Sequence, residues 1–112
     1  MSNRRTASSS VYHAIADPTR RGILDLLRGG EQPVNFLCLR FGISQSAVSQ
    51  HLRVLLLAGL VSERRVGRQR LYKLEAAALI EVADWVGEYE QFWREKLGAL
   101  GAYLDKKEKR KK

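Results

Sequence analysis

Short polar side chains open a helical pattern in the middle of the chain. In the stretch SQSAVSQHLRVLLLAGLV, Gln45, Ser46, Ser49 and Gln50 lead one face of a helix that Ser44 is expected to cap. Glutamine can pair with adenine through two hydrogen bonds in the major groove of DNA, and serine is adaptable there. The N–H groups at such a helix start also suit a phosphate. Either these residues form an ordinary polar helix surface, or they read base edges in double-stranded DNA.

A basic, strand-like segment follows this helix. The residues SERRVGRQRLYKL predict two short strands, 60–66 and 69–74, joined by a hairpin link. Since alternate residues of a strand face opposite sides, the arginines cannot all meet DNA. Arg68, beside the turn glycine, is the best candidate for the minor groove or a flanking phosphate, unless it only keeps the hairpin soluble. The predicted DNA-binding residues are Ser44, Gln45, Ser46, Ser49, Gln50, Arg53, Arg65, Arg68 and Arg70.

The distribution of charge singles out the same segment. The chain has a net charge of +8, and residues 40–73 hold seven lysines and arginines against one acid, Glu63. Residues 75–95 reverse this balance, with six acids against one cation, Arg94. Positive charge is therefore concentrated where DNA is expected to bind.

Capping residues predict the helices that must position these side chains. A first helix is expected over residues 10–16, a second begins at Asp17 and Pro18, and a third begins at Pro33. Two short helices around a glycine turn, between Pro33 and Gly59, are typical of a helix-turn-helix. The predicted fold is therefore mainly α with a small two-stranded antiparallel wing, a winged helix-turn-helix.

Apolar residues recur at helical spacing over the last predicted element, residues 76–104. They make more apolar surface than a short three-helix core can cover. We therefore expect a homodimer formed through the first and last helices. Its predicted interface residues are Val11, Ile15, Leu79, Val82, Val86, Tyr89, Phe92, Trp93, Leu97 and Leu100.

Length and composition set further expectations. The 112 residues predict one domain, 10–104, between a disordered N-terminal arm, 1–9, and a basic disordered tail, 105–112. The sequence contains no run of 18 apolar residues, so no membrane span is expected. The first residues lack the apolar core of a secretory signal. A single cysteine, Cys38, excludes an intrachain disulfide and favours the cytoplasm.

Four segments in order resemble the ArsR family of small winged-helix repressors: DPTRRGILDLL, ISQSAVSQHLRVLLLAGLV, GRQRLYKL and EYEQFW. The resemblance covers about residues 10–104, and the pattern SxVSxHLxxLxxAGLV followed by GRxxxY is specific. It implies a homodimeric repressor that binds a palindromic operator and leaves it when a signal arrives.

The chain departs from the metal-sensing members of that family. Those members carry paired thiolates on the third helix or Asp and His ligands on the last, whereas here the third helix offers a lone Cys38 and residues 79–104 contain no histidine. Asp84 and Glu88 are one turn apart, but zinc prefers about four ligands that include sulfur or imidazole. No metal and no cofactor are expected. The DPTRR start and the tryptophans of the last helix resemble a metal-independent subgroup.

Cys38 and His51 are interpreted as packing residues. Cys38 shares an apolar face with Val34 and Leu37; the alternative is a thiol redox sensor. His51 lies at the core edge of the DNA-reading helix, where it packs or donates to a phosphate. No coherent nucleophile, base or metal arrangement is present in the sequence, so the chain is not expected to be an enzyme.

Large apolar residues also occur on helix faces that should be wet. Phe36, Leu39, Leu56 and Leu57 fall outside the apolar stripes of their helices. They either belong to an enlarged or rotated core or form a patch for a small apolar ligand or a second protein. A protein-interaction module on the same scaffold is therefore the alternative to a DNA-binding repressor.

Overall fold

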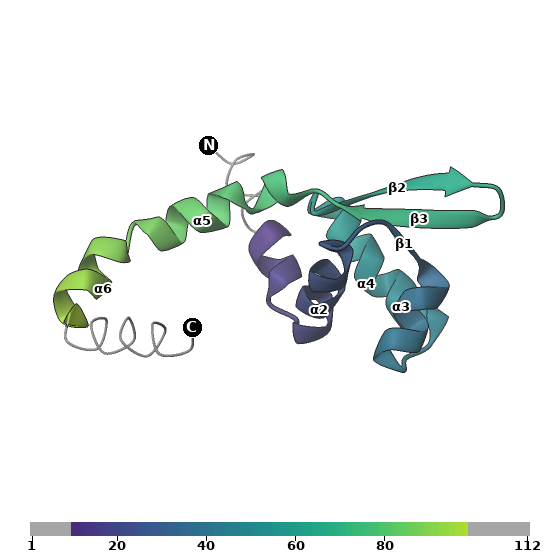
Figure 1. Ribbon diagram of the computed structural model, residues 1–112, viewed down its shortest axis with the longest axis horizontal. Coiled ribbons are helices and arrows are strands. Elements are labelled where there is room, and N and C mark those ends of the chain that lie inside the picture. The colour runs from purple at the N-terminus through teal and green to yellow at the C-terminus, as the bar shows by residue number, and fades with distance from the viewer. Residues whose placement is uncertain (1–9, 99–112) are drawn as a thin grey trace, which may run out of the picture. The chain divides into compact units, whose positions relative to one another are not determined.

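The computed structural model describes residues 10–98 (Figure 1). The chain divides between Glu81 and Val82 into two compact units, so the described residues form a first unit, 10–81, and a second unit, 82–98. The predicted arm 1–9, the predicted tail 105–112 and the predicted interface residue Leu100 lie outside the described residues. Within residues 10–98, no helix combines the length and the apolar character needed to cross a membrane.

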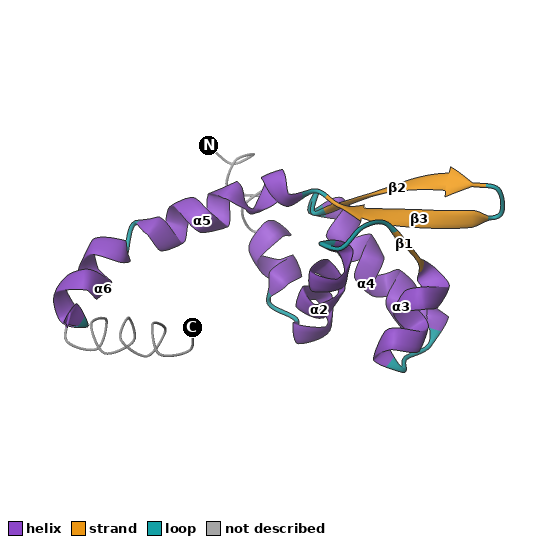
Figure 2. Cartoon of the chain, in the orientation of Figure 1, coloured by secondary structure: helices purple, strands orange, loops and turns teal. Residues whose placement is uncertain are grey.

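The first unit is mostly helical (Figure 2). Its helices are a segment over residues 10–15, α2 (Pro18–Leu27), α3 (Val34–Phe41), α4 (Gln45–Leu57) and a short 3₁₀ helix, η1 (Ala76–Leu79). The predicted caps of α2 and α4 are confirmed: Asp17 accepts from the Arg20 N–H at 3.0 Å, and Ser44 accepts from the Ala47 N–H at 3.1 Å. Each cap satisfies a backbone donor that a helix start leaves unpaired. These two starts therefore follow from local chemistry.

A tight glycine turn separates α3 from α4. Gly42 has a φ of 64°, a left-handed conformation that side chains other than glycine rarely adopt. Its N–H donates to the Cys38 carbonyl at 2.8 Å, which closes the end of α3. The helix-turn-helix predicted between Pro33 and Gly59 is therefore present.

The wing belongs to a three-stranded antiparallel sheet with the order β1-β3-β2, and not to a two-stranded one as predicted. The predicted hairpin is confirmed as β2 (Val61–Val66) and β3 (Gln69–Leu74). The additional strand is β1 (Gln32–Pro33), which pairs with Tyr72 and Leu71 of β3. Proline lacks the N–H that a central strand would use, but it is tolerated at an edge. Two residues that include a proline give no strand pattern in the sequence, so β1 could not be predicted.

The core of the first unit lies between its helices and the base of the wing. It is entirely apolar apart from the Tyr72 hydroxyl, and no buried charged side chain occurs among the described residues. Val11, predicted for the dimer interface, is only 3% exposed within the chain and packs in this core, which leaves little of it for a partner. The buried residues are Val11, Ala14, Ile23, Leu24, Leu27, Leu37, Val48, Leu52, Leu55, Leu60, Val61 and Tyr72.

The last predicted helix is not continuous. Instead of one helix over residues 76–104, the described part contains η1, α5 (Ile80–Gly87) and α6 (Glu90–Lys96). The break follows Gly87, where the Tyr89 N–H donates to the Val86 carbonyl at 3.0 Å in a tighter turn. Glycine costs a helix interior about 1 kcal/mol relative to alanine, because it loses more backbone freedom. The apolar periodicity continues across the break, which is why it predicted one helix.

Candidate nucleic-acid interface

Helix α4 divides cleanly into a buried side and a wet side. Val48, Leu52 and Leu55 are at most 1% exposed and anchor the helix in the core. Ser44 stands at its capped start. Leu57 is exposed at the C-terminal end of α4, and the rest of the wet side carries polar and charged side chains of the predicted set. These exposed residues are Gln45, Ser46, Ser49, Gln50 and Arg53.

The strand register sorts the wing arginines onto two faces. In an antiparallel pair, residues directly opposite each other point to the same face. Arg65 lies opposite Arg70, and Glu63 lies opposite Tyr72, so these side chains share one face of the hairpin. Arg64 lies on the other face, where its guanidinium makes two hydrogen bonds to the Glu31 carboxylate, at 2.7 and 2.8 Å. The omission of Arg64 from the predicted DNA contacts is consistent with this arrangement.

The wet side of α4 and one face of the wing enclose a concave surface. One hollow of about 370 Å³ is lined by Gln45 and Ser49 of α4 together with Arg65, Arg68 and Arg70 of the wing. A second hollow of about 460 Å³ continues along α4 past Ser46, Gln50 and Arg53. We call the residues that line these two hollows the α4–wing surface. It brings together every predicted DNA-binding residue except Ser44, which lies at the adjoining start of α4.

The charge of this surface is strongly positive. Glu63 is the one acidic residue in the linings of the two hollows, and its Oε1 lies 3.6 Å from Arg70 Nη1. Burial raises the pKa of Tyr72, and the neighbouring Glu63 carboxylate adds to that rise. The Tyr72 hydroxyl therefore stays protonated at neutral pH and remains a hydrogen-bond donor.

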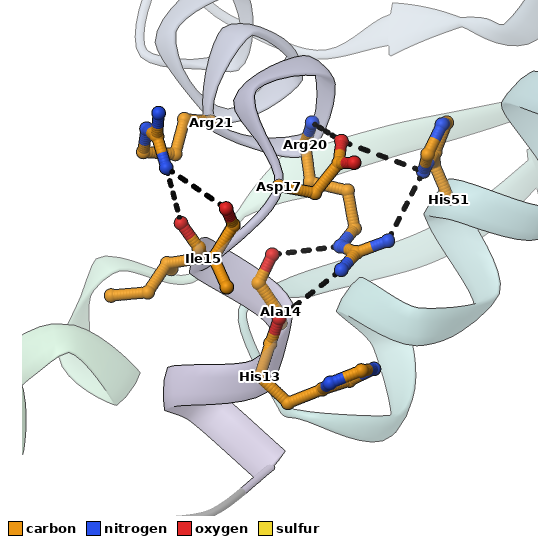
Figure 3. Close-up of polar contacts among 8 residues, drawn as sticks. His13, Ala14, Ile15, Asp17, Arg20, Arg21 and His51 are labelled. Atoms are coloured by element: carbon orange, nitrogen blue, oxygen red, sulfur yellow. Dashed lines mark hydrogen bonds and ion pairs between the residues drawn. The ribbon is translucent and has the colours of Figure 1, made fainter.

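A polar cluster behind α4 went unrecognised in the sequence. Arg20 donates from Nε to the Ala14 carbonyl at 2.7 Å and from Nη2 to the His13 carbonyl at 3.1 Å, while Nη1 lies 3.3 Å from Nδ1 of His51 (Figure 3). The same nitrogen of His51 lies 4.0 Å from Asp17 Oδ2. Since arginine only donates hydrogen bonds, the contact favours an unprotonated Nδ1 on His51.

This cluster connects α4 to two earlier elements. Arg20 belongs to α2, its carbonyl acceptors end the helical segment 10–15, and His51 belongs to α4. His51 is half-buried there, in keeping with its interpretation as a packing residue. The second arginine of DPTRR, Arg21, instead donates to the Ile15 and Ala16 carbonyls. In the sequence, only the spacing of DPTRR and the position of His51 hint at this cluster. The contact between Arg20 and His51 joins residues 31 positions apart, so local patterns do not predict it.

Potential metal ligands do not gather in the described part of the chain. No group of three or more His, Cys, Asp or Glu side chains occurs among residues 10–98 that could hold a metal ion. Cys38 is a half-buried free thiol on α3.

The unexpected apolar residues occupy different surroundings. Leu39 and Leu57 are 85% and 75% exposed, and Phe36 is 38% exposed. Leu56 is half-buried and lines the α4–wing surface. Within the single chain, Phe36, Leu39 and Leu57 therefore do not belong to an enlarged core.

Comparison with known proteins agrees with this geometry. The model of the bacterial regulatory protein family arsR matches residues 17–63. The chain is 38% identical over 78 residues to the transcriptional repressor SdpR of Bacillus subtilis. The aligned residues cover 70% of this chain and 87% of SdpR. It is 35% identical over 95 residues to the HTH-type transcriptional regulator Rv2034 of Mycobacterium tuberculosis. This alignment covers 85% of this chain and 86% of Rv2034.

Solved structures share the fold. An ArsR-like transcriptional regulator from Rhodococcus sp. RHA1 superposes with a TM-score of 0.73 at 28% identity and covers 95% of this chain and 97% of its own. The homodimeric winged helix-turn-helix DNA-binding domain of Mb0332 from Mycobacterium bovis gives a TM-score of 0.66 at 29% identity, with 82% and 87% covered. These relatives are regulators and not enzymes, as predicted. The chain thus belongs to the ArsR family of winged helix-turn-helix, DNA-binding transcriptional regulators.

Proposed function

We propose that this chain represses transcription by binding a palindromic operator as a homodimer. The α4–wing surface is the observation that carries the proposal. It gathers glutamines and serines on a capped helix beside three arginines of a hairpin, with one acid among them. Such a set matches the acceptors and donors of base edges and the charge of the phosphate backbone.

Each half of the surface has its own task in this proposal. The start of α4 enters the major groove, where Gln45 and Gln50 read adenine and the N–H groups near Ser44 approach a phosphate. Arg68, at the tip of the hairpin, reaches the minor groove or a flanking phosphate. Two copies related by a two-fold axis would then read half-sites about 34–36 Å apart, so the operator is palindromic.

Exposed apolar side chains in the second unit support the dimer. Trp85, Phe92 and Trp93 are each about half exposed in the single chain, at 50%, 53% and 47%. Large apolar groups in such number are typical of a surface that a partner covers. The predicted interface residues Tyr89 and Leu97 are exposed to a similar degree. Mb0332, described as homodimeric, offers a precedent.

Metal independence is part of the proposal. Asp84 and Glu88 are exposed carboxylates on the last helices, and Cys38 brings no second sulfur ligand. The repressor would act in the cytoplasm, where a lone thiol stays reduced. Operator affinity is then the same with added Zn²⁺ and with a chelator.

The exposed leucines favour a second candidate function. Leu39 and Leu57 are the most exposed large apolar residues described in the chain. In this alternative the fold serves mainly as an interaction module for a protein or a small apolar ligand, and Cys38 adds at most a thiol response. DNA binding would then be weak and would depend little on salt.

A selection from random duplexes tests the repressor proposal. We expect purified full-length protein to enrich an inverted repeat at physiological salt and to sediment as a dimer at micromolar concentration. Binding to the enriched duplex should weaken steeply with salt, because each neutralised phosphate contributes about 0.9 to the log–log slope. A monomer that enriches no sequence would overturn the proposal.

A further inference from the structure

Glu63 is out of place on the α4–wing surface. It lies on β2 among residues that otherwise match a polyanion, and one of its carboxylate oxygens faces Arg70 Nη1 at 3.6 Å. The side chains of Arg70 and Glu63 are 58% and 34% exposed, so the pair stands in contact with solvent and not in the core. A carboxylate at this position faces the phosphates that the surface is built to receive.

A second glutamate–arginine pair, between Arg64 of the hairpin and Glu31 just before β1, serves as a reference. Arg64 and Glu31 form a closer pair, at 2.7 Å, on the opposite face of the hairpin. The hollow on that side is lined by Leu27, Arg28 and Lys73. Glu63 borders it as well, but none of the predicted DNA-binding residues does. The two pairs have the same chemistry, but only one of them faces the proposed DNA.

We propose that Glu63 limits the DNA affinity of the wing, because it holds Arg70 in an ion pair that competes with DNA phosphates for the guanidinium. The inference rests on the proposed function and names a residue that tunes it. While Arg70 stays on Glu63 it neutralises no phosphate. When a phosphate takes Arg70, the Glu63 carboxylate loses its ion-pair partner, keeps only the neighbouring Tyr72 hydroxyl and is left beside a polyanion. This penalty applies to every sequence, so stable occupancy depends on the base contacts that α4 adds.

Release of Arg70 has a measurable signature. An arginine that neutralises one more phosphate displaces one more counterion, which steepens the log–log dependence of affinity on salt by about 0.9. Exposed ion pairs and like-charge contacts of this kind change affinities by a modest factor. A Glu63→Gln protein should therefore bind both operator and scrambled duplex about two- to fivefold more tightly at moderate salt, with a steeper salt slope.

The experiment measures salt titrations of duplex binding by fluorescence anisotropy for the full-length wild-type protein and four variants. Glu31→Gln is the matched control: it removes the same charge from the partner of a hairpin arginine, Arg64, on the face away from the surface, so we expect no change in slope. In an Arg70→Ala background, Glu63→Gln should add nothing to the slope. Circular dichroism confirms that each variant is folded.

The outcomes separate the two proposals. A steeper slope for Glu63→Gln alone supports the inference. An equal steepening of the slope with Glu31→Gln would show an effect of net charge and overturn it, and so would a steepening with Glu63→Gln that persists in the Arg70→Ala background. A wild-type protein that binds DNA but is unaffected by Glu63→Gln overturns this inference and leaves the repressor proposal standing. If neither the wild-type protein nor any variant binds DNA, both this inference and the repressor proposal are overturned.

Discussion

Gln50 and Arg68 occupy opposite halves of the α4–wing surface and differ in what they can recognise. Gln50 is an exposed amide on the wet side of α4, and Arg68 is an exposed guanidinium at the turn of the hairpin. An amide can satisfy the paired donor and acceptor of one base, whereas a guanidinium near the backbone meets a phosphate that every sequence carries. Their substitution should therefore have different consequences.

We expect Gln50→Ala to weaken operator binding by about 1–3 kcal/mol and to relax sequence preference. Arg68→Ala should weaken operator and scrambled duplex about equally and reduce the salt slope by about 1. Titration of both variants against both duplexes gives the comparison. Equal losses on the two duplexes for Gln50→Ala would remove this residue from base reading.

The start of α2 depends on a charged cap. The hydrogen bond from the Arg20 N–H holds the pKa of Asp17 below its usual value of 3.8, and the nearby charge of Arg20 contributes to the same direction. A folded-state pKa below the unfolded value means that the carboxylate stabilises the fold above that unfolded value. The stabilisation is lost as the pH falls through the folded-state pKa.

Asp17→Asn should therefore flatten the acid end of the stability profile. Asparagine keeps a capping oxygen but does not titrate, so stability at neutral pH should change little while the loss below about pH 4 becomes smaller. Urea unfolding at a series of pH values measures this. An unchanged acid dependence in Asp17→Asn would contradict the assignment.

Two glycines differ in why they are needed. An added Cβ would meet nothing within 4 Å at either Gly87 or Gly42, but only Gly42 has a positive φ, of 64°. We expect Gly87→Ala to raise helix content and to stabilise the protein by about 0.5–1 kcal/mol. Gly42→Ala should instead destabilise it by about 1–2 kcal/mol, because its conformation is left-handed. Circular dichroism and thermal unfolding compare the two, and a loss of stability in Gly87→Ala would contradict this account of the break.

Elements that depend on neighbouring residues were predictable, and elements that depend on distant contacts were not. Asp17 and Ser44 sit within three residues of the N–H groups they cap, so the helix starts follow from sequence. Strand β1 exists only through pairing with Tyr72 and Leu71, and the contact from Arg20 to His51 spans 31 positions. The α4–wing surface was predictable because the two-residue period of a strand and the 3.6-residue period of a helix assign its side chains to faces from sequence spacing alone.

The whole molecule, considered as a single chain, leaves much apolar surface in water. Trp93 of the second unit and Leu39 of the first are both large and exposed, at 47% and 85%. If the second unit forms the dimer interface, Trp93 contributes to association and Leu39 does not. Exposure alone therefore does not identify the interface, and the two residues form a natural comparison.

Trp93→Arg should shift the protein toward monomer and weaken operator binding, because two linked half-sites no longer act together. Leu39→Arg introduces the same charge at an exposed apolar position and should leave the dimer intact. Sedimentation at several concentrations measures both variants. A dimer that survives Trp93→Arg and dissociates with Leu39→Arg would place the interface on the first unit instead.

The two tryptophans of the chain, Trp85 and Trp93, both belong to the second unit. Their indole rings are half exposed in the single chain, so their emission should shift to shorter wavelength when a partner covers them. The first unit, with α4 and the wing, contributes no indole signal at all. Intrinsic emission is therefore a label-free probe of self-association that does not report directly on events at α4.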